Sequence, residues 1–492
     1  MRILLIDPPF YRLFGFYNRY YPLSLVCLGA VLREAGHEVA VYDADFNENP
    51  SAMDYARLPY YYRIYLDSFN DPENRIWREV RTTLEKFRPD LLGISMWTTY
   101  AAAGFHVAKI SKAIDRACPV VVGGPHATVK ADEVLSISPS VDYVVAGEGE
   151  QTLAELADAI EKDGDFSAVN GLVFRRDGRI VRNPPRATTK DLDTFPLPDR
   201  TLLMHEKTYS SEDMGLIMTS RGCPFSCAFC ATETKRVRYR SIQSILAEIR
   251  HVKATYGTTQ FSFKDDSFTV SRKRVLEFCT ALLAERLHIT WECNTRVDLV
   301  DEEMLRQMKR AGCTSIKVGI ESGSEEVLAR MSKGITLDQV RRAAQMFKKV
   351  GIHWTGYFLM GTPGETEKDV YKTLDLMYAI KPDFASIGVY EPFPGTVMFE
   401  EGIDREITRA DMALAEFYTT LPNDYYRASV GTGVETLDPA RFRALESEMK
   451  SKFHAYNKNV ARVLKRAKAR AGLYWHQPAT LLSDFRKYIS WG

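Results

Sequence analysis

Three cysteines stand close together in the chain, and their spacing is typical of a metal site. Cys223, Cys227 and Cys230 form the pattern C-x3-C-x2-C directly after an apolar, strand-like run. Thiolates bind soft metal ions and iron–sulfur clusters. Three thiolates can hold three irons of a cubane and leave the fourth iron free for another ligand. Zinc in a structural site normally takes four protein ligands, and the next residues, Ala-Thr-Glu-Thr-Lys, offer no fourth. Zinc and three unrelated structural cysteines remain the alternatives.

The other five cysteines are isolated, and size and charge limit the class of protein. They read as small buried hydrophobes in a reduced compartment. The start, MRILLIDPPF, is too short and too soon polar for a signal peptide, and no run of eighteen apolar residues occurs. We therefore expect a cytoplasmic protein without a transmembrane segment. Lys plus Arg is 65 and Asp plus Glu is 64 among 492 residues. The chain therefore has no overall excess of basic residues of the kind that a dedicated nucleic-acid-binding protein needs.

The cysteines need elements to position them, and residues 213–404 alternate strand-like and helical patterns. The strands are expected at residues 216–219, 260–264, 289–293, 315–320, 354–360 and 385–390. Helical patterns lie between them, for example at 241–256 and 302–311. Six strand–helix units predict a partial (β/α)6 barrel, two units short of a complete eightfold barrel.

Residues 1–165 form an earlier alternating block. Strands are expected at 2–6, 38–42, 91–95, 119–122 and 143–145, and a helix at 23–35. Continuous β-branched runs between helices predict a parallel, doubly wound, Rossmann-like sheet, which binds ligands at the carboxyl ends of its strands. The loops at 7–9, 96–100, 123–126 and 147–150 follow strands of this block.

Two further segments complete the domain prediction. Residues 166–212 read as a connector that carries a hairpin turning at Asp177-Gly178. Residues 405–492 read as a mainly helical region. Within it, 450–470 forms a basic amphipathic helix with Phe453, Tyr456, Val460 and Leu464 on one face. This helix is either a packed helix with a solvated outer face or a docking surface for an anionic substrate, a protein or a membrane.

The cysteine motif and the strand-end loops resemble those of the radical S-adenosylmethionine superfamily, and Phe229 matches its aromatic position before the last cysteine. The resemblance implies a [4Fe–4S] cluster on the three cysteines. It also implies that the amino and carboxylate groups of S-adenosylmethionine chelate the open iron and that one electron releases a 5′-deoxyadenosyl radical.

The same resemblance assigns roles to residues at successive strand ends. Asp266 lies where the family contacts the methionyl amino group. Arg296 could pair with the methionyl carboxylate, and Glu321 could bind the ribose hydroxyls. Gly361 lies where backbone reads adenine. Taken singly, Asp-Asp or Glu-Ser-Gly after a strand is more often a helix cap.

A Rossmann-like block ahead of the radical domain resembles the cobalamin-binding members of the superfamily. Paired glycines let backbone approach a bulky ligand, although Gly-Gly-Pro-His also reads as a tight turn with His126 as a helix cap. The motif Asp-x-His-x-x-Gly is absent, so the lower corrin face is expected to lie against Met96, Trp97 and Thr98 or against the loop 10–21. The candidate cobalamin residues are Pro22, Trp97, Thr98, Gly123, Gly124, His126, Gly147 and Glu148.

The implied function is a cobalamin-dependent C-methyltransferase that acts on an unactivated carbon through the 5′-deoxyadenosyl radical and methylcobalamin. A non-methylating radical enzyme (a cyclase, a carbon–carbon coupling enzyme or a deoxygenase) and a non-catalytic cobalamin or S-adenosylmethionine sensor are the alternatives. The electron would come from a donor such as ferredoxin or flavodoxin under anaerobic conditions. The resemblance also implies that the C-terminal region 405–492 encodes substrate specificity. The substrate could be a small molecule, a lipid, a peptide or a protein, and no general acid or base can be assigned.

Overall fold

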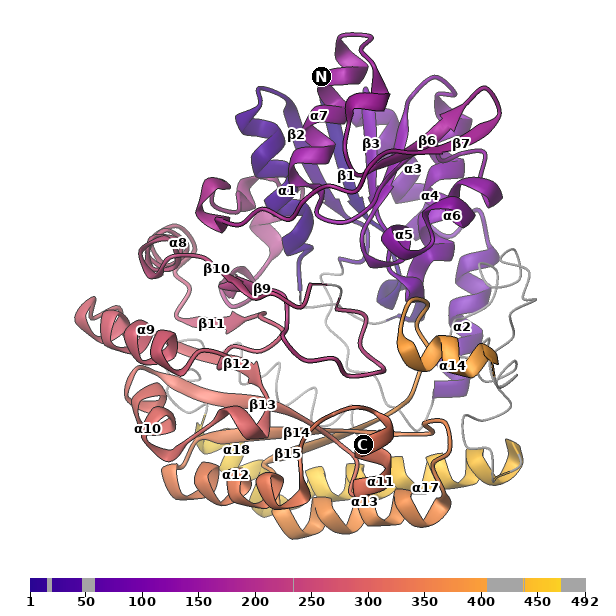
Figure 1. Ribbon diagram of the computed structural model, residues 1–492. Helices are drawn as coiled ribbons and strands as arrows, with labels where there is room; N and C mark the ends of the chain where they lie inside the picture. The colour runs from indigo at the N-terminus through magenta and orange to yellow at the C-terminus, as the bar shows by residue number, and fades with distance from the viewer. Residues whose placement is uncertain (16–19, 47–57, 233, 405–436, 438, 470–492) are drawn as a thin grey trace. The chain divides into compact units, whose positions relative to one another are not determined.

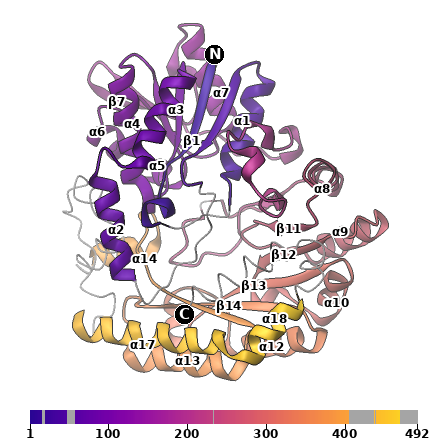
Figure 2. The same ribbon diagram turned by 180° about the vertical axis from the view of Figure 1, so that it is seen from behind.

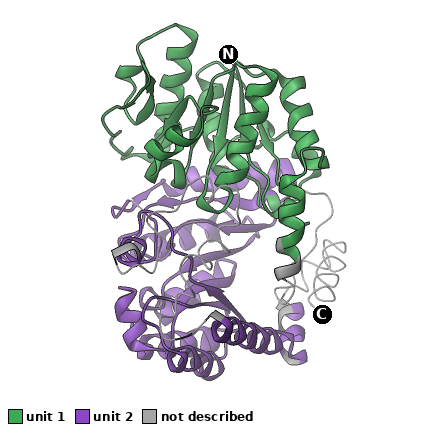
Figure 3. Ribbon diagram, turned by 90° about the vertical axis from the view of Figure 1, so that its right-hand side faces the viewer, with its two compact units in different colours: residues 1–213, 411–425, 491 green, residues 214–410, 426–490, 492 purple. Residues whose placement is uncertain are grey.

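The computed structural model describes the chain except for residues 16–19, 47–57, 233, 405–436, 438 and 470–492 (Figure 1). The described residues up to Asp213 form one compact unit, and those from Met214 onward form a second (Figure 3). Each unit is built around its own large sheet. Within the described part of the chain, no helix is both long enough and apolar enough to cross a membrane.

The first unit contains a seven-stranded sheet in the order β2-β1-β3-β4-β5-β6-β7. Its parallel strands are β1 (Arg2–Asp7), β2 (Glu38–Asp43), β3 (Leu91–Ser95), β4 (Val120–Gly123) and β5 (Tyr143–Val145). This order of the first five strands is that of a flavodoxin-like doubly wound sheet. Ile3, Leu4, Leu5 and Ile6 are all buried, and side chains of a strand point alternately to its two faces. Both faces of the sheet are therefore covered, as predicted.

Helices connect these strands. They are α1 (Leu23–Glu34), α2 (Leu58–Asn70), α3 (Arg75–Phe87), α4 (Ala101–Ile114), α5 (Pro125–Val129), α6 (Ala131–Ile137) and α7 (Gly149–Glu161). The carboxyl ends of the parallel strands open into the loops before α1, α4, α5 and α7. These loops contain the residues predicted to bind cobalamin.

The hairpin that we placed in a connector instead extends the first sheet. Strand β6 (Leu172–Arg176) pairs antiparallel with β5, and β7 (Arg179–Arg182) pairs with β6. The turn at Asp177-Gly178 is as predicted, with both residues at positive φ. Leu172, Val173 and Phe174 are buried. Because an unpaired β5 edge and an apolar hairpin strand can satisfy each other, the hairpin belongs to the first unit.

The second unit contains a six-stranded, all-parallel sheet in the order β15-β14-β13-β12-β11-β8. The strands are β8 (Leu216–Ile217), β11 (Gln260–Phe263), β12 (Thr290–Thr295), β13 (Cys313–Glu321), β14 (His353–Met360) and β15 (Phe384–Val389). The helices between them are α8 (Ile242–Tyr256), α9 (Arg272–Ala284), α10 (Glu302–Arg310), α11 (Glu325–Arg330), α12 (Leu337–Val350) and α13 (Glu367–Ile380). The six strands and their order along the chain agree with the predicted partial barrel.

The two faces of this sheet differ in polarity. In β12, Trp291, Cys293 and Thr295 are buried, while the alternate residues are only half-buried. On the half-buried face, Glu292 forms an ion pair of 2.5 Å with Lys317 of β13. One face of β12 thus carries half-buried polar side chains, and its other face is buried.

The predicted basic helix at 450–470 is two helices, α17 (Pro439–Lys458) and α18 (Val460–Ala469). Helix α17 runs along α13 and contacts β15 (Figures 1 and 2). Asn457 bonds to both the N–H and the C=O of Ala385 in β15, and the helix breaks two residues later. Phe453 and Tyr456 are consequently buried, whereas Val460 and Leu464 are 69% and 63% exposed. One continuous apolar face does not form, although the predicted helical character is confirmed.

Candidate active site

The three cysteines lie in a loop whose base is closed by a short ladder. Strands β9 (Ser220–Arg221) and β10 (Arg238–Tyr239) pair antiparallel on either side of it. Gly222 has φ +90°, and a Cβ there would lie 2.7 Å from the carbonyl oxygen of Arg236. The N–H of Cys223 donates to the carbonyl oxygen of Thr234 at 3.0 Å. The two arms of the loop therefore approach so closely that only glycine fits at position 222.

Asp265, the residue before the predicted Asp266, holds the chain just ahead of this loop. It is 1% exposed, and its carboxylate accepts the backbone N–H groups of Thr219 at 2.6 Å and Ser220 at 3.1 Å. Both hydroxyls of those residues also donate to it. These bonds replace the ladder bonds of β8, which ends at Ile217 rather than at the predicted Thr219. Asp265 thus ties the end of β11 to the start of the cysteine loop.

The three cysteines form no disulfide, and they differ in solvent exposure. Cys223 and Cys227 are half-buried and Cys230 is exposed. Burial raises the pKa of the Cys223 thiol, and the charges of Asp266, Cys230 and Cys227 raise it further. No trio of described His, Cys, Asp or Glu side chains is arranged around a single metal ion. A cubane does not need such a trio, because its three thiolates bind three different irons, and ligand binding would deprotonate them.

Arg296 follows β12 and reaches the cysteine loop. Its guanidinium lies 3.7 Å from the ring centre of Phe225, and its Nη1 donates to Sγ of Cys227 at 3.8 Å. Nε and Nη2 donate to the two carboxylate oxygens of Asp298 at 2.9 and 3.1 Å. Nε and Nη2 face the Asp298 carboxylate, and Nη1 carries a second N–H besides the one directed at Cys227; with this N–H Arg296 could bind a methionyl carboxylate.

Glu321 ends β13 in an unusual backbone conformation. Its φ is +69°, directly after a bulge in the pairing with β14. A non-glycine residue held in this region is strained by about 1–3 kcal/mol and is most common at functional sites. Oε1 accepts from Nζ of Lys333 at 2.7 Å, and both side chains are less than 10% exposed. Oε2 makes no hydrogen bond to the described residues, so it is available to a ligand hydroxyl.

Phe229 and Ala228 fix the middle of the cysteine loop in a small apolar core. Ala228 packs with Val327, Met331, Tyr390 and Met398 at the ends of three elements, and Phe229 packs against this core. The backbone of Ala228 bonds at both sides, donating to Met331 and accepting from Met398. The aromatic residue before Cys230 is thus a packing anchor of the loop.

The loop after β14 contains polar atoms without partners. Gly361 has φ +81°, and a Cβ there would lie 2.9 Å from Phe442 of α17. Oε2 of the buried Glu365 accepts the N–H groups of Gly361 and Thr362 at 2.6 and 3.1 Å. Oε1 of Glu365 and Oγ1 of Thr362 are buried and have no hydrogen-bond partner among the described residues, as is the case for Oγ of Ser267 after β11. Unsatisfied polar atoms gathered at strand ends fit a ligand with many hydrogen-bonding groups, such as S-adenosylmethionine.

In the first unit, Gly124 serves the fold more than a ligand. It has φ +107°, and a Cβ there would lie 2.9 Å from the carbonyl oxygen of Met96. That carbonyl accepts the N–H of His126 at 3.2 Å. His126 is 2% exposed, its Nδ1 lies 3.1 Å from Oγ1 of Thr98, and burial lowers its pKa to about 3. We expected glycine here for the approach of a corrin, but the close approach is that of the β3 loop.

The other predicted cobalamin residues lie at the same edge of the sheet. Gly123 ends β4, and no atom lies closer than 3.7 Å to a Cβ built there. Pro22 is the N-cap of α1 and Glu148 the N-cap of α7. Gly147 has φ +88° and open space around it.

Aromatic side chains are exposed at this edge. Trp97 after β3 is 51% exposed, and Tyr11 after β1 is 42% exposed. Large apolar side chains exposed beside open backbone fit a broad, partly apolar ligand such as a corrin.

An acidic trio at this edge, in which Asp43 and Asp45 are buried and Asp7 is half-buried, was missing from the predicted site. Asp7 ends β1, and Asp43 and Asp45 follow from β2; burial raises the pKa of Asp43 to about 7 and that of Asp45 to about 6. Burial also raises the pKa of Asp7, and its neighbours' charges add to the rise. Tyr209 donates to Asp43 at 2.6 Å, and two amides of the loop after β1 donate to Asp45. The trio shapes the edge, and its only sequence signal was three acidic residues at strand ends.

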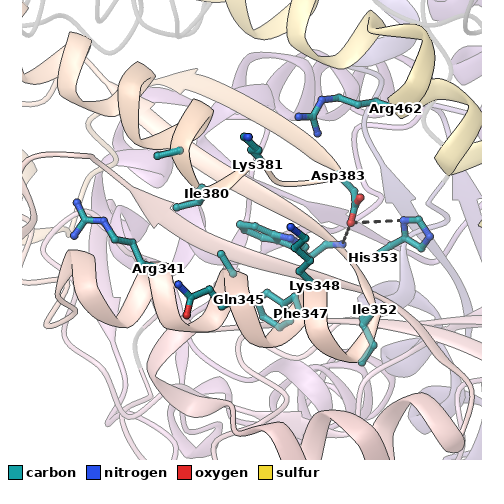
Figure 4. A pocket seen from close by; sticks show the side chains of 14 residues that line it. Arg341, Gln345, Phe347, Lys348, Ile352, His353, Ile380, Lys381, Asp383 and Arg462 are labelled. Carbon is teal, nitrogen blue, oxygen red and sulfur yellow. Dashed lines mark hydrogen bonds and ion pairs between the residues drawn. The ribbon is translucent and has the colours of Figure 1, made fainter.

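A cavity of about 510 Å³ lies elsewhere in the second unit (Figure 4). It opens at the amino-terminal ends of β14 and β15, where Asp383 accepts the N–H of Trp354 and lies 3.6 Å from His353. Arg341, Lys348 and Arg462 stand around it (Figure 4). None of the predicted site residues lines it, because these lie at the carboxyl ends of the strands.

Comparison with known proteins agrees with both units. Residues 217–377 match the Radical SAM superfamily, and residues 14–157 match the B12 binding domain. An uncharacterized methyltransferase of Pyrococcus horikoshii is 33% identical over 412 residues, 82% of this chain and 83% of the relative. An anaerobic magnesium-protoporphyrin IX monomethyl ester cyclase of Rubrivivax gelatinosus is 30% identical over 350 residues, 69% and 62% of the two chains. The solved radical S-adenosylmethionine methyltransferase TsrM of Kitasatospora setae has a TM-score of 0.65 at 20% identity, covering 82% of this chain and 76% of its own.

These matches confirm the predicted fold class and the predicted set of cofactors. A B12 binding domain precedes a radical S-adenosylmethionine domain, so the groups to be held are a [4Fe–4S] cluster, S-adenosylmethionine and cobalamin. The assignment of individual residues to these groups stays a prediction.

Proposed function

Since the chain belongs to the radical S-adenosylmethionine superfamily and carries a B12 binding domain, we propose that it is a cobalamin-dependent C-methyltransferase acting on an unactivated carbon. The observation that carries the proposal is the pairing of a cysteine loop, held at the carboxyl ends of a parallel barrel sheet, with a B12 binding domain in the same chain. The Pyrococcus relative and TsrM are both named methyltransferases, which supports the reaction class.

The cofactors supply the bond cleavage and the methyl group, and the protein residues hold and orient them. We assign the cluster to Cys223, Cys227 and Cys230. We assign S-adenosylmethionine to the residues at the ends of β11–β14 and in the cysteine loop, namely Phe229, Asp266, Arg296, Glu321 and Gly361. Exposed Asp266 and the open Oε2 of Glu321 offer acceptors for an amino group and for hydroxyls.

We assign cobalamin to the carboxyl edge of the first sheet. Five of the assigned residues border this edge directly: Pro22, Trp97, Gly123, Gly147 and Glu148. The other three, Thr98, Gly124 and His126, hold the loops of the edge in place through their contacts with one another and with Met96. Because burial keeps His126 neutral and Thr98 occupies its Nδ1, a contribution of His126 would be through packing and hydrogen bonding rather than charge.

The surroundings of the reaction are also part of the proposal. We expect an external donor such as ferredoxin or flavodoxin to supply the electron, and anaerobic cytoplasm to be the compartment. The substrate class remains open among small molecules, lipids, peptides and proteins, and we expect no nucleic-acid partner.

A non-methylating reaction is the second candidate, because the Rubrivivax relative is named a cyclase. The two candidates differ in what happens to the methyl group of S-adenosylmethionine. A methyltransferase must pass this group to cobalamin and release S-adenosylhomocysteine, whereas a cyclase has no need to.

The test is anaerobic reconstitution of the full chain with iron, sulfide and cobalamin, followed by addition of methyl-deuterated S-adenosylmethionine and a chemical reductant. We expect labelled methylcobalamin, S-adenosylhomocysteine and 5′-deoxyadenosine. Formation of 5′-deoxyadenosine without the first two products would support the cyclase type, and absence of all three would favour a sensor.

Variants separate the two half-reactions. Cys227→Ala should lose the cluster absorbance and the 5′-deoxyadenosine while retaining cobalamin. The control, Cys118→Ala, alters a buried thiol of the first unit and should keep the cluster. Full 5′-deoxyadenosine formation by Cys227→Ala would refute the cluster assignment.

A further inference from the structure

Lys333 is a buried lysine that no sequence signal singled out. It lies in the segment Met331–Gly334, here called the clamp segment, between α11 and α12. Lys333 is only 7% exposed. Lysine is almost never buried unless its ammonium is paired. Its partners therefore indicate why it is there.

The clamp segment holds the cysteine loop through its backbone. The carbonyl oxygen of Met331 accepts the N–H of Ala228 at 2.8 Å, between Cys227 and Phe229. Met331 is fully buried in the core that contains Ala228. The ammonium of Lys333 lies 5.7 Å from the ring centre of Phe229, within reach of a cation–π contact.

The same segment holds the end of β12. Nη2 of Arg296 donates to the carbonyl oxygen of Lys333 at 2.7 Å, and the guanidinium lies over the ring of Phe225. Arg296 is 6% exposed. One residue, Lys333, thus contacts the cysteine loop with its side chain and the Arg296 side chain with its backbone.

The ammonium of Lys333 also holds the end of β13. It donates to Oε1 of Glu321 at 2.7 Å. A Cβ at Gly319 would lie 2.2 Å from that Oε1 and 2.9 Å from Nζ, so the pair occupies space left by a glycine. Two cations, Arg296 and Lys333, are each matched with a carboxylate, Asp298 and Glu321. The pairs are therefore buried without net charge.

We propose that Lys333 is a positioning residue of the S-adenosylmethionine site. Its ammonium holds Oε1 of Glu321, which leaves Oε2 for the ligand. Because the same ammonium contacts Phe229, it also fixes the position of this carboxylate relative to the cysteine loop. The inference rests on the proposed function, because it concerns the same site. It predicts that loss of the ammonium weakens S-adenosylmethionine binding and leaves the three cysteines able to carry a cluster.

The test compares the reconstituted full chain with Lys333→Met and Lys333→Arg. Iron and sulfide content report the cluster, and the change in the electron paramagnetic resonance signal of the reduced cluster on titration reports S-adenosylmethionine affinity. Lys333→Met should keep the iron content and bind S-adenosylmethionine about tenfold more weakly. Lys333→Arg should restore most of the affinity. The matched control is Lys372→Met, whose partly exposed ammonium pairs with the buried Asp369 and the exposed Glu326, and it should bind as wild type does.

A double-mutant cycle with Glu321→Gln shows whether Lys333 acts through Glu321. If it does, Lys333→Gln should weaken binding little further in the Glu321→Gln background. Additive losses would overturn the proposal, as would wild-type affinity in Lys333→Met with lower thermal stability alone. If Lys333→Met does not fold, the double-mutant cycle with the milder Lys333→Gln tests the proposal instead. Failure of the wild type itself to bind S-adenosylmethionine would refute the proposed function rather than the role of Lys333.

Discussion

Replacing Glu365 by glutamine should change how the stability of the second unit depends on pH. Glu365 is 0% exposed, and its Oε2 accepts two backbone N–H groups while Oε1 has no partner. Burial raises its pKa from an ordinary 4.5 to about 7, although the two N–H bonds oppose this. The folded state therefore holds the proton more tightly than the unfolded chain does. Stability contributed by this proton is complete below pH 4.5 and is lost as the pH rises to about 7.

The size of the effect follows from the two pKa values. A rise from 4.5 to about 7 corresponds to roughly 3 kcal/mol of unfolding free energy between acid and alkaline pH. Glutamine retains an oxygen for the two N–H groups but cannot ionise. Glu365→Gln should therefore match wild type at about pH 4 and be more stable by up to roughly 3 kcal/mol at about pH 9, which is several degrees in Tm.

The assay is thermal unfolding of both proteins across this pH range under argon. The control is Glu326→Gln, an exposed carboxylate whose pKa hydrogen bonds lower to about 2. This control should show no gain in Tm at alkaline pH. A Tm difference between Glu365→Gln and wild type that stays constant with pH would refute the reasoning, since it would mean that folding does not raise the pKa of Glu365.

Three further substitutions test the first unit. Gly124→Ala should destabilise it by about 1–3 kcal/mol in urea unfolding, because φ is +107° and the new Cβ would meet Met96, whereas Gly123→Ala has room and should cost less. Equal losses for the two alanines would contradict the packing argument. Trp97→Ala should keep the wild-type Tm, because the side chain is 51% exposed, and should lower cobalamin affinity about tenfold in equilibrium dialysis. Unchanged affinity would remove Trp97 from the site.

The positions of the strands along the chain could be predicted from the sequence because buried parallel strands are continuous apolar runs. The predicted ranges 91–95 and 143–145 coincide with β3 and β5. The cysteine loop was equally readable, since its three thiols lie close together in the chain. These features depend on neighbours in sequence, which a pattern can represent.

What the sequence could not predict depends on contacts between distant segments. Lys333 is more than one hundred residues from Phe229, and Phe442 restricts Gly361 from another helix. Asn457 of α17 bonds through its side chain to Ala385 of β15, more than seventy residues away in the chain. The hairpin β6–β7 joined the first sheet because β5 offered it an edge. In each case the local pattern was compatible with several tertiary partners.

The closed base of the cysteine loop has a consequence for how the enzyme matures. The ladder β9–β10, the bonds to Asp265 and the packing of Ala228 fix the loop, and none of these contacts uses a cysteine thiol. Small zinc domains, in contrast, obtain their fold from the metal itself. We therefore expect the polypeptide to fold first and to receive its iron and sulfide afterwards. Oxygen damage that strips the cluster would then leave a folded scaffold, ready to be reloaded rather than degraded.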